Sequence, residues 1–506
     1  SVAGRPLISQ GNLLIILSVV VVVLVAAFVP LITLALTNAT DDDGQVKDDV
    51  HDLKKKVDQL SMNQEMYDGA PAPAEDDGEI NWNFRSISGF GYNQRNWGAS
   101  GTPLARLAQP SEWQLIESGS TVNERAISLA ISNEECCERE SESGHNQLFV
   151  AFGQLLDHDI TLSTGCGGML PRLAINVTGD PVFDPDSDQV DPFIRLDRRA
   201  VFYDSEGNPQ FNNAISSWID ASFLYGSDDV RMINLRTMEN GSMRSYPHDQ
   251  GDLLPVNVIA EDSEMQDFQN SACGFVCGDV RCEEQPNLMA LHTVFLRYHN
   301  IIADRVNALH PEFTEDQKFG YTRMIVIGVL NKIVYEEWLP SIFPELDPLG
   351  PVADFVEPNE PPMFLHFPFA AFRFGHTMVA NEVWLGAQND TAMYKFDEIT
   401  LLEGFFNTTH ILRHNIDPFV VGMVLQPAKR FDSCVIPNLQ HHLFQNVNGA
   451  FLDLLAINLA RGRETQIPTF NAVRQYYGLS PITTFADLVG TDDEPFSSQL
   501  IGNLTA

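Results

Sequence analysis

Three long segments of this sequence repeat apolar residues at helical spacing, and no other pattern narrows the range of folds as much. Residues 146–160 place five apolar side chains on one broad helical face, and residues 288–302 and 321–335 carry similar stripes. Strand-like alternation is sparse, and the segments between the stripes are long and contain Pro and Gly. A mainly α-helical domain with long loops is therefore expected.

The charge of the chain excludes one large class of partners. Its 506 residues include 31 Lys and Arg against 68 Asp and Glu, which gives a formal net charge of −37. Such an acidic protein repels phosphate backbones, so we expect no nucleic-acid partner. Hydrophobic residues make up 44% of the chain and include 32 Phe, enough to bury a large core.

An uncharged apolar stretch near the N-terminus predicts a membrane segment. Residues 13–36 are long enough to cross a bilayer as a helix. Arg5 precedes the stretch and three Asp follow it, which favours residues 1–12 as a short cytoplasmic N-terminus. We expect a transmembrane signal anchor at the plasma membrane. The alternative is a long signal peptide, with residues 1–37 cleaved and the protein secreted.

The segment after the anchor has the composition of a spacer. Residues 37–80 contain a short apolar 4-3-4-3 pattern, which fits a brief coiled coil or a solvated stalk helix, and then an acidic, Pro-rich linker. The globular domain is expected over residues 81–506, outside the cytoplasm. Six N-glycosylation motifs agree with that compartment.

Seven cysteines suit a large extracellular domain with two or three disulfides. The spacing Cys273-x3-Cys277-x4-Cys282 lacks the paired pattern of zinc sites, and a local disulfide is preferred to metal ligation. An odd count leaves at least one thiol free or paired between chains. The spare cysteine and the stalk are thus two routes to a homo-oligomer.

A polar trio interrupts the first apolar stripe. In the string from Ala151 to Asp159, Gln154 stands three residues before Asp157 and four before His158. On a helix this spacing gathers an amide, a carboxylate and an imidazole on one face. An isolated string of this kind is most often a polar helix end, so its meaning depends on the rest of the chain.

Six ordered motifs give the trio that context. From residue 83 to residue 479 the sequence resembles the animal haem peroxidases. The motifs are Asn96-Trp-Gly-Ala-Ser-Gly-Thr-Pro103, Gly153-Gln-Leu-Leu-Asp-His-Asp159, Trp218-Ile-Asp-Ala-Ser-Phe-Leu-Tyr-Gly-Ser227, Gly278-Asp-Val-Arg-Cys-Glu-Glu-Gln-Pro286, Leu291-His-Thr-Val-Phe-Leu-Arg-Tyr-His-Asn300 and Phe372-Arg-Phe-Gly-His-Thr377. The resemblance implies a single large haem-peroxidase domain, with a C-terminal part shorter than is usual in the family.

The resemblance also implies how haem b is held. His376 matches the proximal iron ligand, and Asn458 matches the Asn that bonds the other ring nitrogen of that ligand. Arg373 and Arg461 match the partners of the haem propionates.

On the distal side, three residues match the family's peroxide chemistry. His158 corresponds to the general base for hydrogen peroxide, and Arg281 to the group that stabilises negative charge as the O–O bond breaks. Gln154 corresponds to the residue that positions water or halide.

Two carboxylates and a loop carry further implied roles. Asp157 and Glu284 match the residues that form ester bonds to haem methyl groups, whereas Gln285 stands where myeloperoxidase has the Met of its sulfonium bond. A calcium site would combine Asp159 with the loop residues Ser216, Trp218, Asp220 and Ser222, since hard oxygen ligands suit Ca²⁺ and Trp218 would offer its carbonyl.

The expected function is reduction of hydrogen peroxide through a ferryl intermediate, with a small electron donor that is either a halide or pseudohalide or a phenol. A haem-free adhesion or matrix module is the alternative. A fatty-acid dioxygenase is less favoured, because such enzymes have a radical Tyr three residues before the proximal His, where this chain has Arg373. The segment Glu464-Thr-Gln466 departs from the family's Asp-His-Gly and puts the packing behind the proximal side in question.

Overall fold

A computed structural model describes residues 84–107, 122–132, 139–166, 170–256, 274–344, 361–389, 392–445, 452–484 and 487. The predicted anchor at 13–36 and the spacer at 37–80 lie outside these residues and remain predictions. Within the ranges just given, no helix has both the length and the apolar character to cross a membrane.

Contacts divide the chain into two units. Of the described residues, the smaller unit holds Phe84 and Gly386–Phe396, and the larger one holds those of Arg85–Leu385 and Asp397–Ala506. Every residue of the candidate site belongs to the larger unit.

Helices dominate the described chain, which confirms the mainly α prediction. The helices are α3 Glu124–Ile131, α4 Gln147–Ile160, α5 Ser222–Tyr225, α6 Asp229–Leu235, α7 Pro286–Leu309, α8 Glu315–Ile333, α9 Leu339–Ile342, α10 His366–Phe369, α11 Leu401–Gly404, α12 Thr409–His414, α13 Asp417–Leu425, α14 Pro437–Gln440, α16 Leu454–Thr465 and α17 Phe470–Tyr476, with a π turn η2 Val334–Trp338 and a 3-10 helix η3 Ala371–Met378. The strands form two-stranded sheets: β1 Leu173–Asn176 with β2 Phe193–Leu196, β3 Phe202–Tyr203 with β4 Pro209–Gln210, and β5 Glu382–Gln388 with β6 Met393–Thr400.

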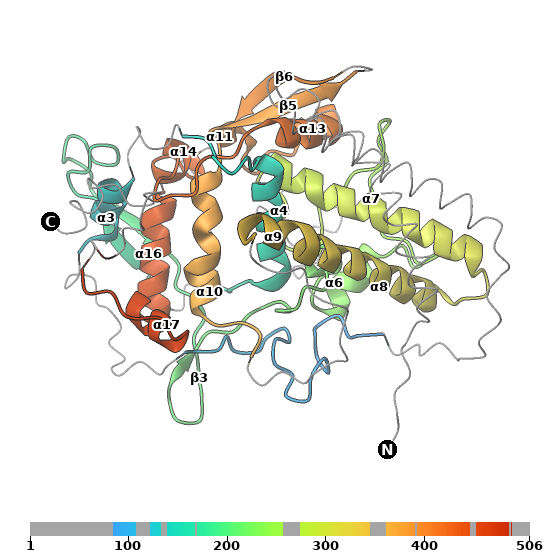
Figure 1. Cartoon of the computed structure of the whole chain (residues 1–506), viewed down its shortest axis with the longest axis horizontal. Coiled ribbons are helices and arrows are strands. Elements are labelled where there is room, and N and C mark those ends of the chain that lie inside the picture. The colour runs from blue at the N-terminus through green and yellow to red at the C-terminus, as the bar shows by residue number, and fades with distance from the viewer. Residues whose placement is uncertain are drawn as a thin grey trace. The chain divides into compact units, whose positions relative to one another are not determined.

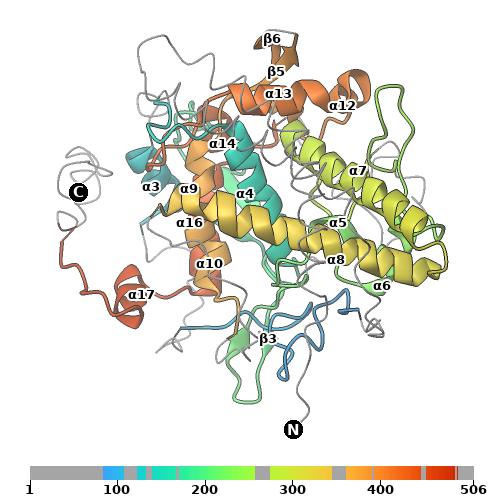
Figure 2. The same cartoon turned by 45° about the vertical axis from the view of Figure 1, so that its right-hand side comes forward.

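The three apolar stripes form the long helices α4, α7 and α8, and local capping sets where each begins. Asn146 caps α4 by accepting from the backbone N–H of Phe149, and Gln285 caps α7 just before a Pro at its first position. Thr314 and Gln317 form a capping box at α8. The third stripe runs past α8 into η2. Helices α7 and α8 pack side by side, and α4 lies against α7 (Figures 1 and 2).

Helix α16 is held from behind by the β1–β2 sheet. Ile175 and Ile194 of the sheet pack with Ala456 and Ala460 of the helix in one buried cluster. Arg125 of α3 braces the start of α16, because its guanidinium, 2% exposed, binds Asp180 and the α16 N-cap Asp453, each at 2.7 Å. The face of α16 that carries Asn458 is thereby fixed by both hydrophobic and ionic contacts.

The cysteine prediction is partly settled. A disulfide joins Cys277 and Cys282, which confirms a local disulfide in that motif. Cys434 is disulfide-bonded as well, and Cys166 is a buried free thiol. Cys273 lies outside the described residues.

The loop closed by this disulfide lies directly on α5. A Cβ atom at Gly278 would stand 2.3 Å from the carbonyl oxygen of Ser222 and 2.5 Å from the backbone nitrogen of Gly226. Only glycine allows two backbones to approach this closely. The glycine therefore sets how the 277–282 loop, which carries Arg281, docks on α5.

Replacing Gly278 with Ala should destabilise the domain by about 3 kcal/mol, because neither contacting backbone atom can move aside easily. Gly328 in α8 is the matched control: it is exposed, a Cβ atom there would meet nothing within 4 Å, and Ala should be neutral or stabilising by up to about 1 kcal/mol. Thermal unfolding of the two variants checks this. Equal midpoints for both would contradict the proposed docking.

Candidate functional site

A cavity of about 300 Å³ lies among α4, η3 and the segment that precedes α7. Its polar lining comes from Gln147, Gln154, Asp157, His158, Arg281, Glu284, Gln285, Asn287, Arg373, His376 and Glu382. Apolar residues such as Phe149, Phe372, Phe374, Phe405 and Leu443 complete the wall. Helical periodicity places the trio of α4 on one face, but only the fold brings segments more than two hundred residues away to the same cavity.

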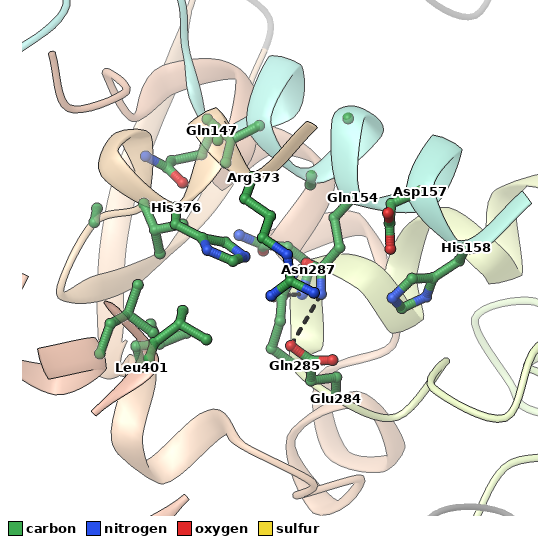
Figure 3. Close-up of a pocket in the computed structure, with 18 of the residues that line it drawn as sticks. Gln147, Gln154, Asp157, His158, Glu284, Gln285, Asn287, Arg373, His376 and Leu401 are labelled. Atoms are coloured by element: carbon green, nitrogen blue, oxygen red, sulfur yellow. Dashed lines mark hydrogen bonds between the residues drawn. The ribbon is translucent and has the colours of Figure 1, made fainter. Parts of the chain in front are cut away.

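Two histidines enter the cavity from different elements. His158 comes from α4 and His376 from η3, and their rings point toward each other across the space between them (Figure 3). Burial together with Arg373 lowers the pKa of His376 to about 3. Burial together with Arg281 holds the pKa of His158 well below its ordinary value. Both imidazoles are therefore neutral at neutral pH, so His376 can ligate a metal and His158 can accept a proton.

His376 has the partner that was expected for it. Asn458 of α16 lies with its side-chain Nδ2 2.9 Å from His376 Nδ1. Arg373 donates to the Asn458 Oδ1 atom and, through Nε, to the Pro368 carbonyl at 2.9 Å. The ring orientation of His376 is thus fixed by a side chain that is itself held in place.

Arg281 is fixed by three groups. Its Nε and Nη2 atoms each lie 2.9 Å from a different oxygen of Asp279, Nη2 donates to the Thr161 carbonyl at 2.7 Å, and Nη1 donates to Asp157 at 3.1 Å. Burial opposes the charge of Arg281, but Asp279 outweighs it and holds the pKa of Arg281 above its ordinary value. A permanently charged donor therefore faces the same cavity as His158.

Gln154 belongs to a short chain of hydrogen bonds. Its Nε2 donates to Glu284 at 3.1 Å, and its Oε1 accepts from Gln285 Nε2 at 3.2 Å (Figure 3). Gln285 is held in turn by the backbone N–H of Asn287 at 2.8 Å. Burial raises the pKa of Glu284 to about 7 and also raises the pKa of Asp157. These hydrogen bonds fix the orientation of the Gln154 amide, with its nitrogen toward Glu284 and its oxygen toward Gln285.

Arg461 lies outside the cavity lining, unlike Arg373. Its Nη1 donates to the Asp197 carbonyl at 2.7 Å and to Glu464 at 2.8 Å. Burial is the main cause that lowers the pKa of nearby Arg199 to about 10, and the positive charges of Arg461 and Arg373 lower this pKa further. Arg199, Arg373 and Arg461 thus share the nearby carboxylate of Glu464, which leaves an excess of positive charge. Such a charge suits the two acidic propionates of haem.

The departure at residues 464–466 is accommodated. Glu464 is buried and accepts from the backbone N–H of Arg199 at 2.9 Å as well as from Arg461. Thr465 donates to the Arg461 carbonyl at 2.8 Å. Gln466 ends α16 at φ 52°, a left-handed conformation that favours glycine. Glu464 and Thr465 are thus held by hydrogen bonds, whereas Gln466 adopts a backbone conformation that is strained for a residue other than glycine.

Asp159, next to His158 in the chain, and Asp220 are two buried carboxylates that repel each other and lack enough hydrogen-bond donors. Asp159 is 0% exposed, and its Oδ1 accepts a long bond of 3.4 Å from the Phe223 N–H. Oδ2 of Asp159 and Oδ1 of Asp220 have no hydrogen-bond partner. Burial and the Asp220 charge raise the pKa of Asp159 well above its ordinary value. A cation between the two carboxylates would relieve both the repulsion and the missing bonds.

The rest of the predicted calcium loop lies at the same place. Ser216 and Ser222 are buried, and Ser222 Oγ donates to the Asp159 carbonyl at 2.6 Å. Trp218 donates its backbone N–H to Ser216 Oγ at 3.2 Å. In the part of the chain that the structure describes, no cluster of three or more His, Cys, Asp or Glu is arranged to hold a metal. A calcium site here would need hydroxyl and carbonyl oxygens besides its two carboxylates.

Sequence reasoning missed Asp279. It stands two residues before Arg281 in the loop closed by Cys277 and Cys282, and it is 2% exposed. The Asp-x-Arg spacing inside a short closed loop was a usable signal, because the two side chains of such a loop can meet. Its second contact, with His158, joins positions more than a hundred residues apart and could not be inferred from the sequence.

Comparisons with known proteins agree with this geometry. The family model described as animal haem peroxidase matches residues 84–501. Peroxinectin A of Dictyostelium discoideum is 30% identical over 436 residues, which cover 82% of this chain and 79% of that protein. Human myeloperoxidase is 27% identical over 458 residues, and the match covers 80% of this chain but only 60% of myeloperoxidase.

Solved structures show the same relationship. Peroxidase A from Dictyostelium discoideum superposes with a TM-score of 0.73 at 27% identity, covering 83% of this chain and 82% of that one. A fatty acid α-dioxygenase from Oryza sativa gives a TM-score of 0.63 at 16% identity, covering 83% of this chain and 71% of that one, which shows a common fold alone. The resemblance predicted from the motifs is confirmed: the chain belongs to the animal haem peroxidase family.

Proposed function

We propose that this haem peroxidase reduces hydrogen peroxide with His376 as the iron ligand and His158 as the proton acceptor, and oxidises halide, pseudohalide or phenolic donors. The observation that carries the proposal is the pair of neutral histidines facing one cavity, with Asn458 behind His376 and Arg281 beside His158. When bound, the haem iron supplies the two-electron reduction of the peroxide.

The residues of the chain divide the remaining work. His158 takes a proton from hydrogen peroxide and can return it to the departing oxygen. Arg281, held by Asp279 and Thr161, offers positive charge where the O–O bond breaks. Asn458, itself held by Arg373, keeps the His376 ring in place through its contact with Nδ1, so the other ring nitrogen is the one available to iron.

Two features of the cavity support the proposed donors. Gln154 presents an amide of fixed orientation, a donor suited to a halide or to water. Phe372, Phe374 and Phe405 line the wall and suit a flat aromatic donor such as a phenol. Arg373, in place of a tyrosine that could carry a radical, speaks against fatty-acid oxygenation.

The proposed function is tested with two histidine variants. His376→Ala should lose the Soret band of the haem-loaded protein. His158→Ala should keep it while the rate constant for reaction with hydrogen peroxide falls by about 10²- to 10⁴-fold. Stopped-flow absorbance and guaiacol oxidation measure these quantities, with His310→Ala on the exposed end of α7 as control. A parent protein with no Soret band after expression with haem would favour the haem-free alternative.

Asp157 and Glu284 are the proposed ester-forming residues, since both line the cavity and burial raises the pKa of both. After incubation with peroxide, haem should stay with the parent chain during acid–organic extraction. The double variant Asp157→Asn with Glu284→Gln should release it completely, and each single variant should retain haem through the other bond. Free extraction from the parent would remove the ester proposal without affecting the peroxidase proposal.

We also propose Ca²⁺ between Asp159 and Asp220, on the evidence of their unpaired buried oxygens. Chelation should lower the thermal midpoint of the parent by roughly 3 °C, since an ion present at a hundred times its Kd stabilises by about 2.7 kcal/mol, and added calcium should restore the midpoint. Asp159→Asn should respond to neither treatment.

Asp184→Asn is the control for the calcium prediction. Asp184 is equally buried, but both of its oxygens accept backbone N–H groups, from Gly179 at 2.8 Å and Gln189 at 3.0 Å. This variant should lose stability and still respond to calcium. A parent midpoint that ignores both chelator and calcium would exclude the site.

A further inference from the structure

One buried carboxylate touches both groups that act on peroxide. Asp279 Oδ1 lies 3.5 Å from His158 Nδ1 and 2.9 Å from Arg281 Nε. Its Oδ2 lies 2.9 Å from Arg281 Nη2, so the carboxylate and the guanidinium meet as two parallel bonds. Asp279 lines no part of the cavity itself.

The charge of Asp279 is secure in this position. Burial alone would raise its pKa, but Arg281 and His158 outweigh burial and hold the pKa of Asp279 well below its ordinary value. Among the charges that act on His158, Arg281 and His292 oppose a positive imidazole and Asp279 favours it. His292 cannot replace Asp279, because an imidazole has no negative charge to offer a positive His158.

The backbone holds the Asp279 side chain before any ligand arrives. The Asp279 N–H donates to the Phe223 carbonyl at 3.1 Å, and Asp279 Oδ1 accepts the Arg281 backbone N–H at 2.9 Å. The disulfide between Cys277 and Cys282 closes the loop on either side. The loop also packs on α5 at Gly278. The position of the Asp279 carboxylate is therefore set by the loop and not by His158 or Arg281.

We propose that Asp279 is a positioning residue shared by His158 and Arg281, which fixes the proton of His158 on Nδ1 and leaves Nε2 to accept the proton of the peroxide. His158 Nδ1 is buried, makes no hydrogen bond and lies 3.5 Å from Asp279 Oδ1, so a proton on Nδ1 would find an acceptor there, and His158 itself lines the cavity. A carboxylate behind one ring nitrogen selects the tautomer and orientation of an imidazole base. The same carboxylate sets the angle of the Arg281 fork. This inference rests on the proposed function, because it concerns the same reaction.

Cyanide binding gives a readout that does not depend on turnover. Hydrogen cyanide must give its proton to the distal base as cyanide binds the ferric iron, so its association rate reports the position of His158. Asp279→Asn keeps the shape of the side chain but removes its charge and can present an N–H to Nδ1. In this variant the rate constants for cyanide binding and for reaction with peroxide should both fall by roughly tenfold to a hundredfold, with the Soret band retained.

A double variant separates positioning from simple loss of charge near the haem. In a His158→Ala background, Asp279→Asn should change the cyanide rate by less than about twofold, because the base that takes the proton of hydrogen cyanide is gone. Asp184→Asn, which removes a buried carboxylate held by the backbone N–H groups of Gly179 and Gln189, is the matched control. It should lower stability and leave both rates per haem unchanged.

If Asp279→Asn does not fold, Asp279→Glu decides the question. Glutamate keeps the charge that buried Arg281 requires, but its extra methylene displaces the carboxylate from both partners, so both rates should fall at least about fivefold. The proposal is overturned if Asp279→Asn binds cyanide and reacts with peroxide at rates within twofold of the parent. If Asp279→Asn does not fold, the same result in Asp279→Glu overturns it. If the parent protein binds no haem, the proposed function and this inference both fail. If the parent reacts rapidly with peroxide and the Asp279 variants have the same rate constants, only this inference fails.

Discussion

The backbone contact between the 277–282 loop and α5 is the constraint on which the site depends. Gly278 has no room for a side chain there, and Phe223 of α5 uses its carbonyl for Asp279 and its N–H for Asp159. One short helix therefore links the proposed calcium ligand next to His158 with the loop that carries Arg281. A disturbance at Asp159 would reach both distal groups through covalent and hydrogen-bonded neighbours.

The buried arginines and carboxylates around the site are paired unequally. Asp279 and Asp157 neutralise Arg281, while Glu464 balances Arg461 only in part, so positive charge remains around Arg199 and Arg373. Buried charges without partners are costly. The surplus arginine charge beside Glu464 and the buried carboxylates Asp159 and Asp220 are the two places where the proposed haem propionates and Ca²⁺ would supply the opposite charge.

Much of the site was predictable because its residues stand in local motifs. Gln154, Asp157 and His158 share a helical face by spacing alone, and the resemblance assigned His376 and Asn458, which the structure brings within 2.9 Å of each other. Arg461 was expected near a propionate, yet its guanidinium bonds Glu464 and the Asp197 carbonyl. Such a side-chain choice depends on which neighbour the fold supplies, and the neighbour Glu464 belongs to the segment in which this chain departs from its family.

The sequence by itself determined the helical class, the family and the chemistry available at each motif, because periodicity and short motifs are local properties of the chain. Tertiary structure alone decided which motifs meet. Asp279 contacts His158 although 121 positions separate the two residues in the sequence. Gln285, at the start of another helix, fixes the Gln154 amide. Contacts of this kind follow from how α4, α5 and the 277–282 loop pack, and packing is set by the shapes of all the buried side chains together.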